Sequence, residues 1–176
     1  MFQGLGRARM PDDAAGEGRE AAAPVINGLI QTLREARRAA RITQLDLAGR
    51  LGVTELTVVE WEARRDVPAT GNLFRWAQAL GYVVELRESS SGELLADRTS
   101  SSRAGSSVDS RLRRIQKLLR QTRVAGGLTQ EELGIELGVS TWTVRMWESG
   151  QRTPRLAHLV TWCMILNCHP ALARPE

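Results

Sequence analysis

The sequence predicts an all-α protein made of two tandem copies of one small helical bundle, joined by a Ser-rich linker. The first observation behind this prediction is an internal repeat, because residues 43–68 and 129–154 are identical at eleven of 26 positions without a gap. The second is the spacing of apolar residues, which recur in each copy every three or four positions, as in amphipathic helices. The third is the stretch between the copies, which has three serine clusters and few apolar residues.

In the first copy the pattern predicts a helix that ends near Arg41 and a second helix that begins after Thr43. Side chains three or four positions apart lie on one helix face, so the apolar residues of both helices face a common core. Thr43 can cap the second helix, with Asp46 as the acid three residues on, in a relative of the capping box. Gly52 is expected to end this helix in a left-handed turn.

A third helix is expected from its N-cap Thr54 to about Ala63, and a fourth follows Pro68. The second copy repeats these signals 86 positions later. The equivalent cap, turn and loop residues there are Thr129, Gly138, Ser140 and Pro154. The inward residues of the two fourth helices are Leu73, Trp76 and Leu80, and Leu159, Trp162 and Leu166.

These signals divide the chain into four segments. Composition predicts a flexible N-terminal tail at 1–26, which contains no apolar run of signal-peptide length. The first domain is expected at 27–87, the linker at 88–109 and the second domain at 110–176. Each domain carries its own set of inward apolar residues, so we expect the two to fold separately.

A small β-hairpin could follow the first domain at residues 82–96. Tyr82–Leu86 is rich in residues that favour strands, and a Ser-Ser-Ser-Gly turn precedes a second short apolar stretch. No counterpart is expected in the second copy, because Pro170 falls where the equivalent strand would form.

The pI of about 10.0 arises almost wholly from arginine, since Lys117 is the only lysine. Arginine makes planar, bidentate contacts with phosphate and base edges, which suits a nucleic-acid partner, and a GC-rich genome would produce the same bias. No apolar run is long enough to span a membrane, and a cytoplasmic, nucleoid-associated location is expected. The sequence has no nucleophile–base pattern, phosphate-binding glycine loop or paired carboxylates, so we expect no enzyme activity, cofactor or small-molecule ligand.

Two cysteines and two histidines cluster near the C-terminus, at His158, Cys163, Cys168 and His169. Their spacing matches none of the usual zinc sites. Cys163 lies in an apolar helical run and is expected to be a small buried hydrophobic residue, so no metal is predicted.

Two helices joined by a tight Gly-containing turn form a helix-turn-helix unit. In each copy Thr-Gln is followed by Leu-Gly-Val-Thr or Leu-Gly-Val-Ser, then by Thr-Val-x-x-Trp-Glu and a proline-bearing loop. This pattern resembles the lambda-repressor-like, or XRE, family of DNA-binding domains over residues 27–87 and 110–172. The resemblance implies a transcriptional regulator that binds double-stranded DNA sequence-specifically, such as a repressor of the phage-immunity type.

In the resembled family the third helix enters the major groove and its first residues touch base edges. Carried over by position, the base-reading residues are Thr54, Glu55, Leu56, Thr57 and Glu60, and Ser140, Thr141, Trp142, Thr143 and Met146. Arg145 joins them because arginine pairs bidentately with guanine. The expected contacts to the DNA backbone are Gln44 and Gln130, by resemblance, and Arg64, Arg65 and Arg152, which follow the third helices.

Two ion pairs are also implied by the resemblance. Arg37 with Glu62, and Arg123 with Glu148, match a buried pair that ties the first helix to the third in this family. Both pairs are expected to be structural.

The outward residues of the third helices differ between the copies, whereas the inward Val58 and Trp61 recur as Val144 and Trp147. This favours two different reading heads on one scaffold, and a monomer that reads an asymmetric two-part site. Trp142 and its neighbour Met146 could contact thymine methyl groups or a protein. Two alternatives therefore remain. One is an antitoxin-like protein with one DNA-binding and one partner-binding copy, and the other is a low-specificity DNA-bridging architectural protein.

Overall fold

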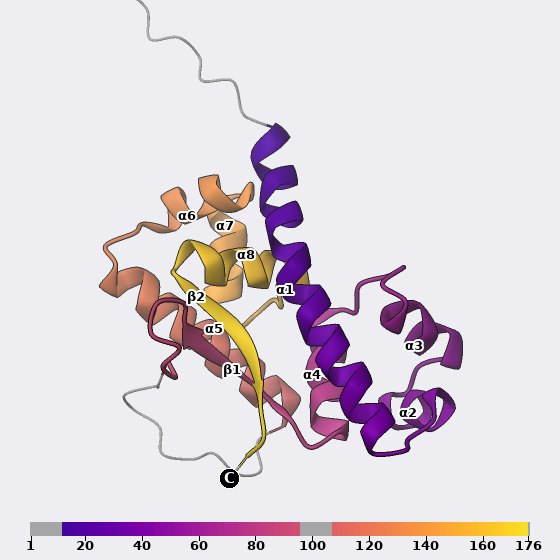
Figure 1. The fold of residues 1–176 in the computed structure, drawn as a ribbon. Helices are drawn as coiled ribbons and strands as arrows, with labels where there is room; N and C mark the ends of the chain where they lie inside the picture. The colour runs from indigo at the N-terminus through magenta and orange to yellow at the C-terminus, as the bar shows by residue number, and fades with distance from the viewer. Residues whose placement is uncertain (1–11, 96–106, 176) are drawn as a thin grey trace, which may run out of the picture.

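The computed structural model describes residues 12–95 and 107–175, which form eight helices and two short strands (Figure 1). The first copy contains α1 (Asp12–Ala39), α2 (Gln44–Leu51), α3 (Glu55–Glu62), α4 (Thr70–Ala79) and β1 (Val83–Glu88). The second contains α5 (Val108–Ala125), α6 (Gln130–Leu137), α7 (Thr141–Glu148), α8 (Leu156–Ile165) and β2 (Cys168–Ala173). The predicted all-α tandem repeat is confirmed, while much of the predicted linker lies outside the described residues. No helix in the described ranges is long and apolar enough to cross a membrane.

The predicted caps begin and end the short helices. Thr43 and Asp46 form a full capping box at the start of α2, and Thr129 and Glu132 form its equivalent at α6. The Thr43 side chain and the Thr43 backbone N–H both donate hydrogen bonds to the Asp46 carboxylate and lower its pKa. The side-chain hydrogen bond has the larger effect. The Thr129 backbone and side chain likewise lower the pKa of Glu132. These carboxylates therefore stay ionised where they satisfy free N–H groups at the helix start.

The prediction of a flexible tail at residues 1–26 is wrong for residues 12–26, the part that the structure describes. Helix α1 begins at Asp12 and runs unbroken into the first copy. Ala22 and Ile26 are buried, and α1 packs against α6 and α8 of the second copy. An Ala- and Gly-rich, charged segment cannot bury enough apolar surface by itself to stay ordered. The second copy supplies the apolar partner that the composition did not reveal.

Strand β1 pairs in an antiparallel ladder with β2, which follows the second copy, so the expectation that Pro170 excludes a strand is wrong. Pro170 stands opposite Leu86. The Leu86 carbonyl accepts a hydrogen bond from the Leu95 N–H at 2.8 Å, so the backbone polar groups of Leu86 face away from β2. In an antiparallel ladder, the N–H and C=O groups of two directly opposed residues either both point toward the other strand or both point away from it. Pro170 therefore occupies a position where the ladder needs no N–H group.

After β1 the chain turns back on itself, within the segment where a hairpin was predicted. The Glu88 N–H donates to the Glu93 carbonyl at 2.9 Å, and Arg87 forms an isolated bridge with Leu94. The returning segment covers one edge of β1, whereas β2 covers the other.

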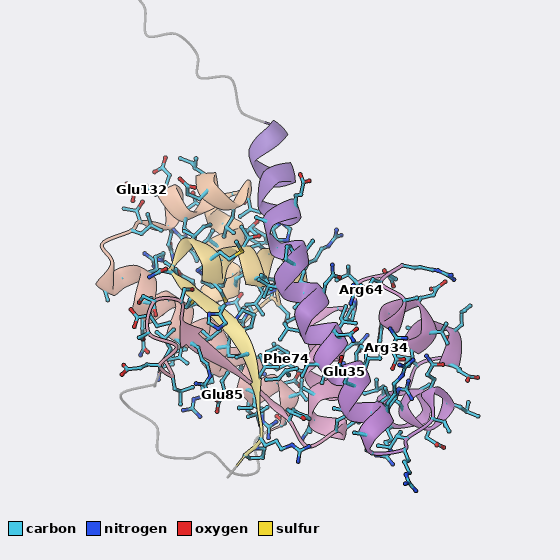
Figure 2. The ribbon with its side chains drawn as sticks, in the orientation of Figure 1. Arg34, Glu35, Arg64, Phe74, Glu85 and Glu132 are labelled. Atoms are coloured by element: carbon cyan, nitrogen blue, oxygen red, sulfur yellow. The ribbon has the colours of Figure 1, made fainter. Side chains whose placement is uncertain are left out.

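The two copies share one hydrophobic core, whereas each was expected to carry its own set of inward apolar residues. Helix α1 of the first copy packs on α8 of the second, and α4 packs on α5. Figure 2 shows the side chains that fill the space between these elements. The Thr70 hydroxyl also donates to the Pro154 carbonyl at 2.5 Å across the junction between the copies. The inward apolar residues of each copy are thus partly covered by the other copy.

Left-handed backbone positions recur in both copies with different residues. Arg41 has φ of 56°, and its equivalent Gly127 has φ of 72°. Because a side chain costs about 1 kcal/mol in this conformation, Arg41→Gly should raise the free energy of unfolding by about that amount. Gly127→Ala should lower it similarly, since a Cβ there meets no other atom and only the backbone is strained. Urea denaturation measures both, and a destabilising Arg41→Gly would contradict the prediction.

Candidate nucleic-acid interface

The α2–α3 pair forms a tight helix-turn-helix unit whose third helix has one buried and one exposed face. Gly52 turns the chain with φ of 69°, and the Thr54 side chain caps α3 by accepting from the Thr57 N–H at 3.2 Å. Val58 and Trp61 are buried, as their spacing predicts. Leu56 is 64% exposed beside the exposed Thr54. The α2–α3 pair is called the first reading head.

The α6–α7 pair repeats this arrangement and is called the second reading head. Its turn residue Gly138 has φ of 65°, and Val144 and Trp147 are buried. Trp142 stands at the position of Leu56 and is 51% exposed. The backbone frame is therefore the same in both heads, while the exposed residue at this position differs.

The predicted base-reading residues all lie on or beside the outward faces of α3 and α7, and none is buried. Those classed as exposed are Thr54, Glu55, Leu56, Ser140, Trp142 and Arg145. Those that are half-buried are Thr57, Glu60, Thr141, Thr143 and Met146. The hydroxyls of Thr54 and Thr57 lie 2.8 Å apart, and those of Ser140 and Thr143 lie 3.0 Å apart. These four residues hold the N-terminal turns of α3 and α7, and the other side chains project from that frame.

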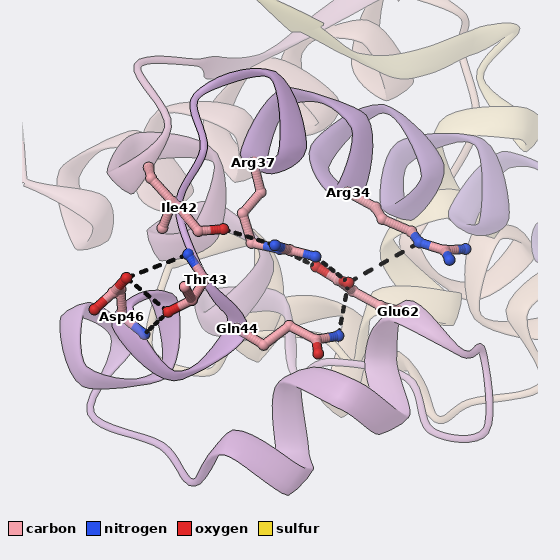
Figure 3. A network of polar contacts seen from close by, with 7 residues as sticks. All are labelled: Arg34, Arg37, Ile42, Thr43, Gln44, Asp46 and Glu62. Carbon is pink, nitrogen blue, oxygen red and sulfur yellow. Dashed lines mark hydrogen bonds and ion pairs between the residues drawn. The ribbon is translucent and has the colours of Figure 1, made fainter.

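A buried ion pair joins α1 to α3 in the first copy (Figure 3). Arg37 Nε and Nη2 donate to the two carboxylate oxygens of Glu62 at 2.6 and 2.7 Å, and Nη1 donates to the Ile42 carbonyl at 2.6 Å. The hydrogen bonds with Glu62 raise the pKa of Arg37 although burial opposes them. The pair therefore stays charged and fixes α3 against α1.

The second copy contains the same pair. Arg123 Nε and Nη2 donate to the Glu148 carboxylate at 2.5 and 2.9 Å, and Nη1 donates to the Leu128 carbonyl at 2.6 Å. Arg123 is 7% exposed and Glu148 is 6% exposed. This pair joins α5 to α7, so α3 and α7 are each held by an arginine from the first helix of their own copy.

Gln44 and Gln130, the two glutamines that we expect to contact the DNA backbone, form hydrogen bonds with these ion pairs. Gln44 Nε2 donates to Glu62 at 2.9 Å, and Gln130 Nε2 donates to Glu148 at 2.7 Å. An amide nitrogen carries two hydrogens, so each glutamine keeps one further N–H for a second acceptor. The ion pair thus orients the glutamine at the start of the second helix, a link that sequence spacing alone did not predict.

The arginines that follow the recognition helices lie at different places in the two copies. Arg64 and Arg65 are exposed, and Arg64 Nη2 donates to Gln31 Oε1 at 3.1 Å. In the second copy the Arg152 guanidinium lies 4.7 Å from the centre of the Trp142 ring. This cation–π contact places a positive charge over an exposed residue of the second reading head.

The first copy cannot make this contact, because Leu56 and Asp66 occupy the positions of Trp142 and Arg152. The outward residues of α3 also include Glu55 and Glu60. The second head is therefore the more positive one around its recognition helix, and it should attract phosphate more strongly.

The cysteines lie away from both reading heads, at the end of α8 and the start of β2. Cys163 and Cys168 are buried free thiols, and Cys163 is a buried hydrophobic residue as predicted. A hydrogen bond with Cys168, together with burial, raises the pKa of Cys163. Within the described ranges no group of His, Cys, Asp and Glu residues could hold a metal ion.

Comparison with known families agrees with this geometry. The sequence model of the helix-turn-helix family matches residues 33–85 and again residues 119–172, which together make up more than half of the chain. The chain belongs to the lambda-repressor-like, XRE-type helix-turn-helix family. No curated protein and no solved structure matches it.

A helix-turn-helix protein of this type is a DNA-binding transcriptional regulator, and the family is not an enzyme family. The two matched ranges contain both reading heads and both ion pairs. Helices α3 and α7 are the second helices of the two helix-turn-helix units within these ranges.

Proposed function

We propose that this regulator is a sequence-specific repressor of the phage-immunity type that reads a two-part site with two unlike recognition helices. The observation that carries the proposal is one repeated frame with different exposed side chains, Leu56 in the first head and Trp142 in the second. Because equivalent positions present different chemistry, the two heads favour different bases. The protein acts in the cytoplasm, at the nucleoid, without a cofactor.

In the second head, Arg145 pairs with guanine through two hydrogen bonds, and Trp142 contacts thymine methyl groups. In the first head, Glu55 or Glu60 accepts from the amino group of cytosine. Gln44 and Gln130 donate to phosphate, as do the free N–H groups at the starts of α2 and α6. These backbone contacts set the register in which the exposed side chains meet the bases.

Selection of bound sites from random duplex DNA by the full chain, with excess competitor DNA, tests this function. The expected result is a defined site with two different halves. Binding without sequence preference would support the architectural alternative instead. A promoter carrying the selected site in front of a reporter gene then tests repression, and a rise in transcription would contradict the repressor assignment.

The antitoxin-like alternative depends on Trp142 and Met146 facing a protein partner. In that case Trp142→Ala would leave the selected DNA site unchanged. The proposed function expects the same variant to lose preference within one half of the site only.

Arg145→Ala should weaken binding to the selected site by about 1–3 kcal/mol and relax base preference in one half-site only. Gln130→Ala should weaken binding to all sequences, since it removes a backbone contact. Arg87→Ala, on β1, is the matched arginine control and should change neither property. Fluorescence anisotropy on the selected and single-substituted duplexes measures this. Equal loss of preference in both half-sites after Arg145→Ala would contradict the assignment of two different heads.

We further propose that one chain occupies the whole site, because two reading heads are already present in each chain. Light scattering of the protein–DNA complex should give one chain per duplex. Two chains per duplex would contradict the monomer proposal.

A further inference from the structure

We infer that the two reading heads are related by an internal pseudo-two-fold axis, and that their half-sites are therefore inverted and held at one spacing. This inference rests on the proposed DNA-reading function. It differs from the picture of two heads on a flexible linker, which would accept direct repeats and a range of spacings.

The first observation is the register of the β ladder. With the 86-residue offset of the repeat, Glu85 and Ala171 are equivalent positions, and they pair with each other. Val83 pairs with Ala173, the equivalent of Arg87, and Arg87 pairs with His169, the equivalent of Val83. Exchanging the two copies therefore maps the ladder onto itself. This is the pattern of an interface between two subunits related by a two-fold axis, here formed within one chain.

The second observation is that helix packing between the copies is reciprocal. Helix α1 is equivalent to α5, and α4 is equivalent to α8. The contact of α1 with α8 and the contact of α5 with α4 are thus the same contact made in both directions. The contact between α1 and α8 is the more extensive of the two, and α1 also contacts α6 and β2.

The third observation is that α3 and α7 lie beside the same axis. The loops that follow α3 and α7 continue into residues 67–72 and 153–158, which are equivalent segments and line one shared cleft. The Thr70–Pro154 hydrogen bond joins them directly. Figure 1 shows α2–α3 and α6–α7 at two outer sides of the molecule, with α1, α4 and α8 between them. The heads therefore flank the junction and are held by the shared core rather than by the linker.

Duplex DNA has its own two-fold axes perpendicular to the helix axis, and heads related by a two-fold axis meet the two strands in opposite directions. The half-sites must then be inverted with respect to each other. Their sequences still differ, because Leu56 and Trp142 and the neighbouring side chains differ. A rigid core also fixes the distance between the heads, so the half-site centres should lie about 10 base pairs, one helical turn, apart.

The test uses the full chain and synthetic duplexes built from the two selected half-sites. The half-site whose preference is relaxed by Arg145→Ala belongs to the second head. The two halves are then joined as an inverted pair and as a direct pair, and the inverted pair is also lengthened by about 5 base pairs, half a helical turn. Anisotropy titrations compare the affinities, with duplexes carrying one half-site as the control.

The inverted duplex should bind on the order of 100-fold more tightly than either single half-site, because the second head binds at a high effective concentration. The direct and lengthened duplexes should bind like a single half-site. Equal affinity for the direct pair, tolerance of the added base pairs, or two duplexes bound by one chain would overturn the inference and leave the proposed function standing. Failure to distinguish any half-site from random DNA would overturn the proposed function and this inference together.

Discussion

Glu148→Gln should destabilise the protein by about 3–5 kcal/mol, because it leaves the buried guanidinium of Arg123 without a counter-charge. Arg123 makes two of its hydrogen bonds to the Glu148 carboxylate and is only 7% exposed. Glutamine keeps the size of the side chain, so the change tests charge and hydrogen bonding rather than packing. The substitution also alters the acceptor for Gln130. Urea denaturation followed by far-UV circular dichroism measures the loss.

Glu131→Gln is the matched control, because Glu131 is exposed on α6 and undergoes the same chemical change. Its effect should stay within about 0.5 kcal/mol. Replacing both partners, as in Arg123→Met with Glu148→Leu, should cost less than Glu148→Gln alone, since no buried charge is left unpaired. If Glu148→Gln costs no more than the control, the ion pair does not stabilise the fold in the way described.

Trp162→Ala in the second copy should destabilise both copies together by about 3–5 kcal/mol. Trp162 is fully buried, and its ring centre lies 6.2 Å from that of Trp147. It lies on α8, which packs against α1 of the first copy. Because the copies share one core, a cavity under α8 should weaken the packing of α1 and, through it, of the first reading head.

Hydrogen–deuterium exchange resolved by peptide distinguishes shared from separate folding. In Trp162→Ala, the amides of α2–α4 should lose protection along with those of α6–α8. Met164→Ala on the same helix is the control, because Met164 is 40% exposed and its removal leaves a smaller cavity. Loss of protection confined to the second copy would show that the two copies fold independently after all.

Much of each copy could be predicted from the sequence, because the signals that form it are local or repeated. Thr43 and Gly52 begin and end α2 through hydrogen bonds and backbone angles set within a few residues. The spacing of Val58 and Trp61 identifies the buried face of α3, and by exclusion the exposed face on which the candidate site lies. The Arg37–Glu62 pair spans 25 positions, and family resemblance rather than local pattern predicted it.

The contacts inside the candidate site were only partly predictable. The position of Gln44 suggested a phosphate contact, but its hydrogen bond to Glu62 depends on how α2 and α3 pack. The position of Arg152 likewise gave no sign that its guanidinium lies over Trp142. A side chain with several rotatable bonds can reach many partners, and the packing of neighbouring elements selects one of them.

By itself, the sequence determined that there are two copies, where most of their helices begin and end, and which face of each recognition helix is exposed. Only the tertiary structure decided that α1 extends back to Asp12, that β1 pairs with β2, and that the copies share a core around a pseudo-two-fold axis. Ala22 and Ile26 are ordered because the second copy covers them, and Pro170 is tolerated because its backbone faces away from β1. These outcomes depend on contacts between residues far apart in the chain, and periodicity and local propensity carry no information about such contacts.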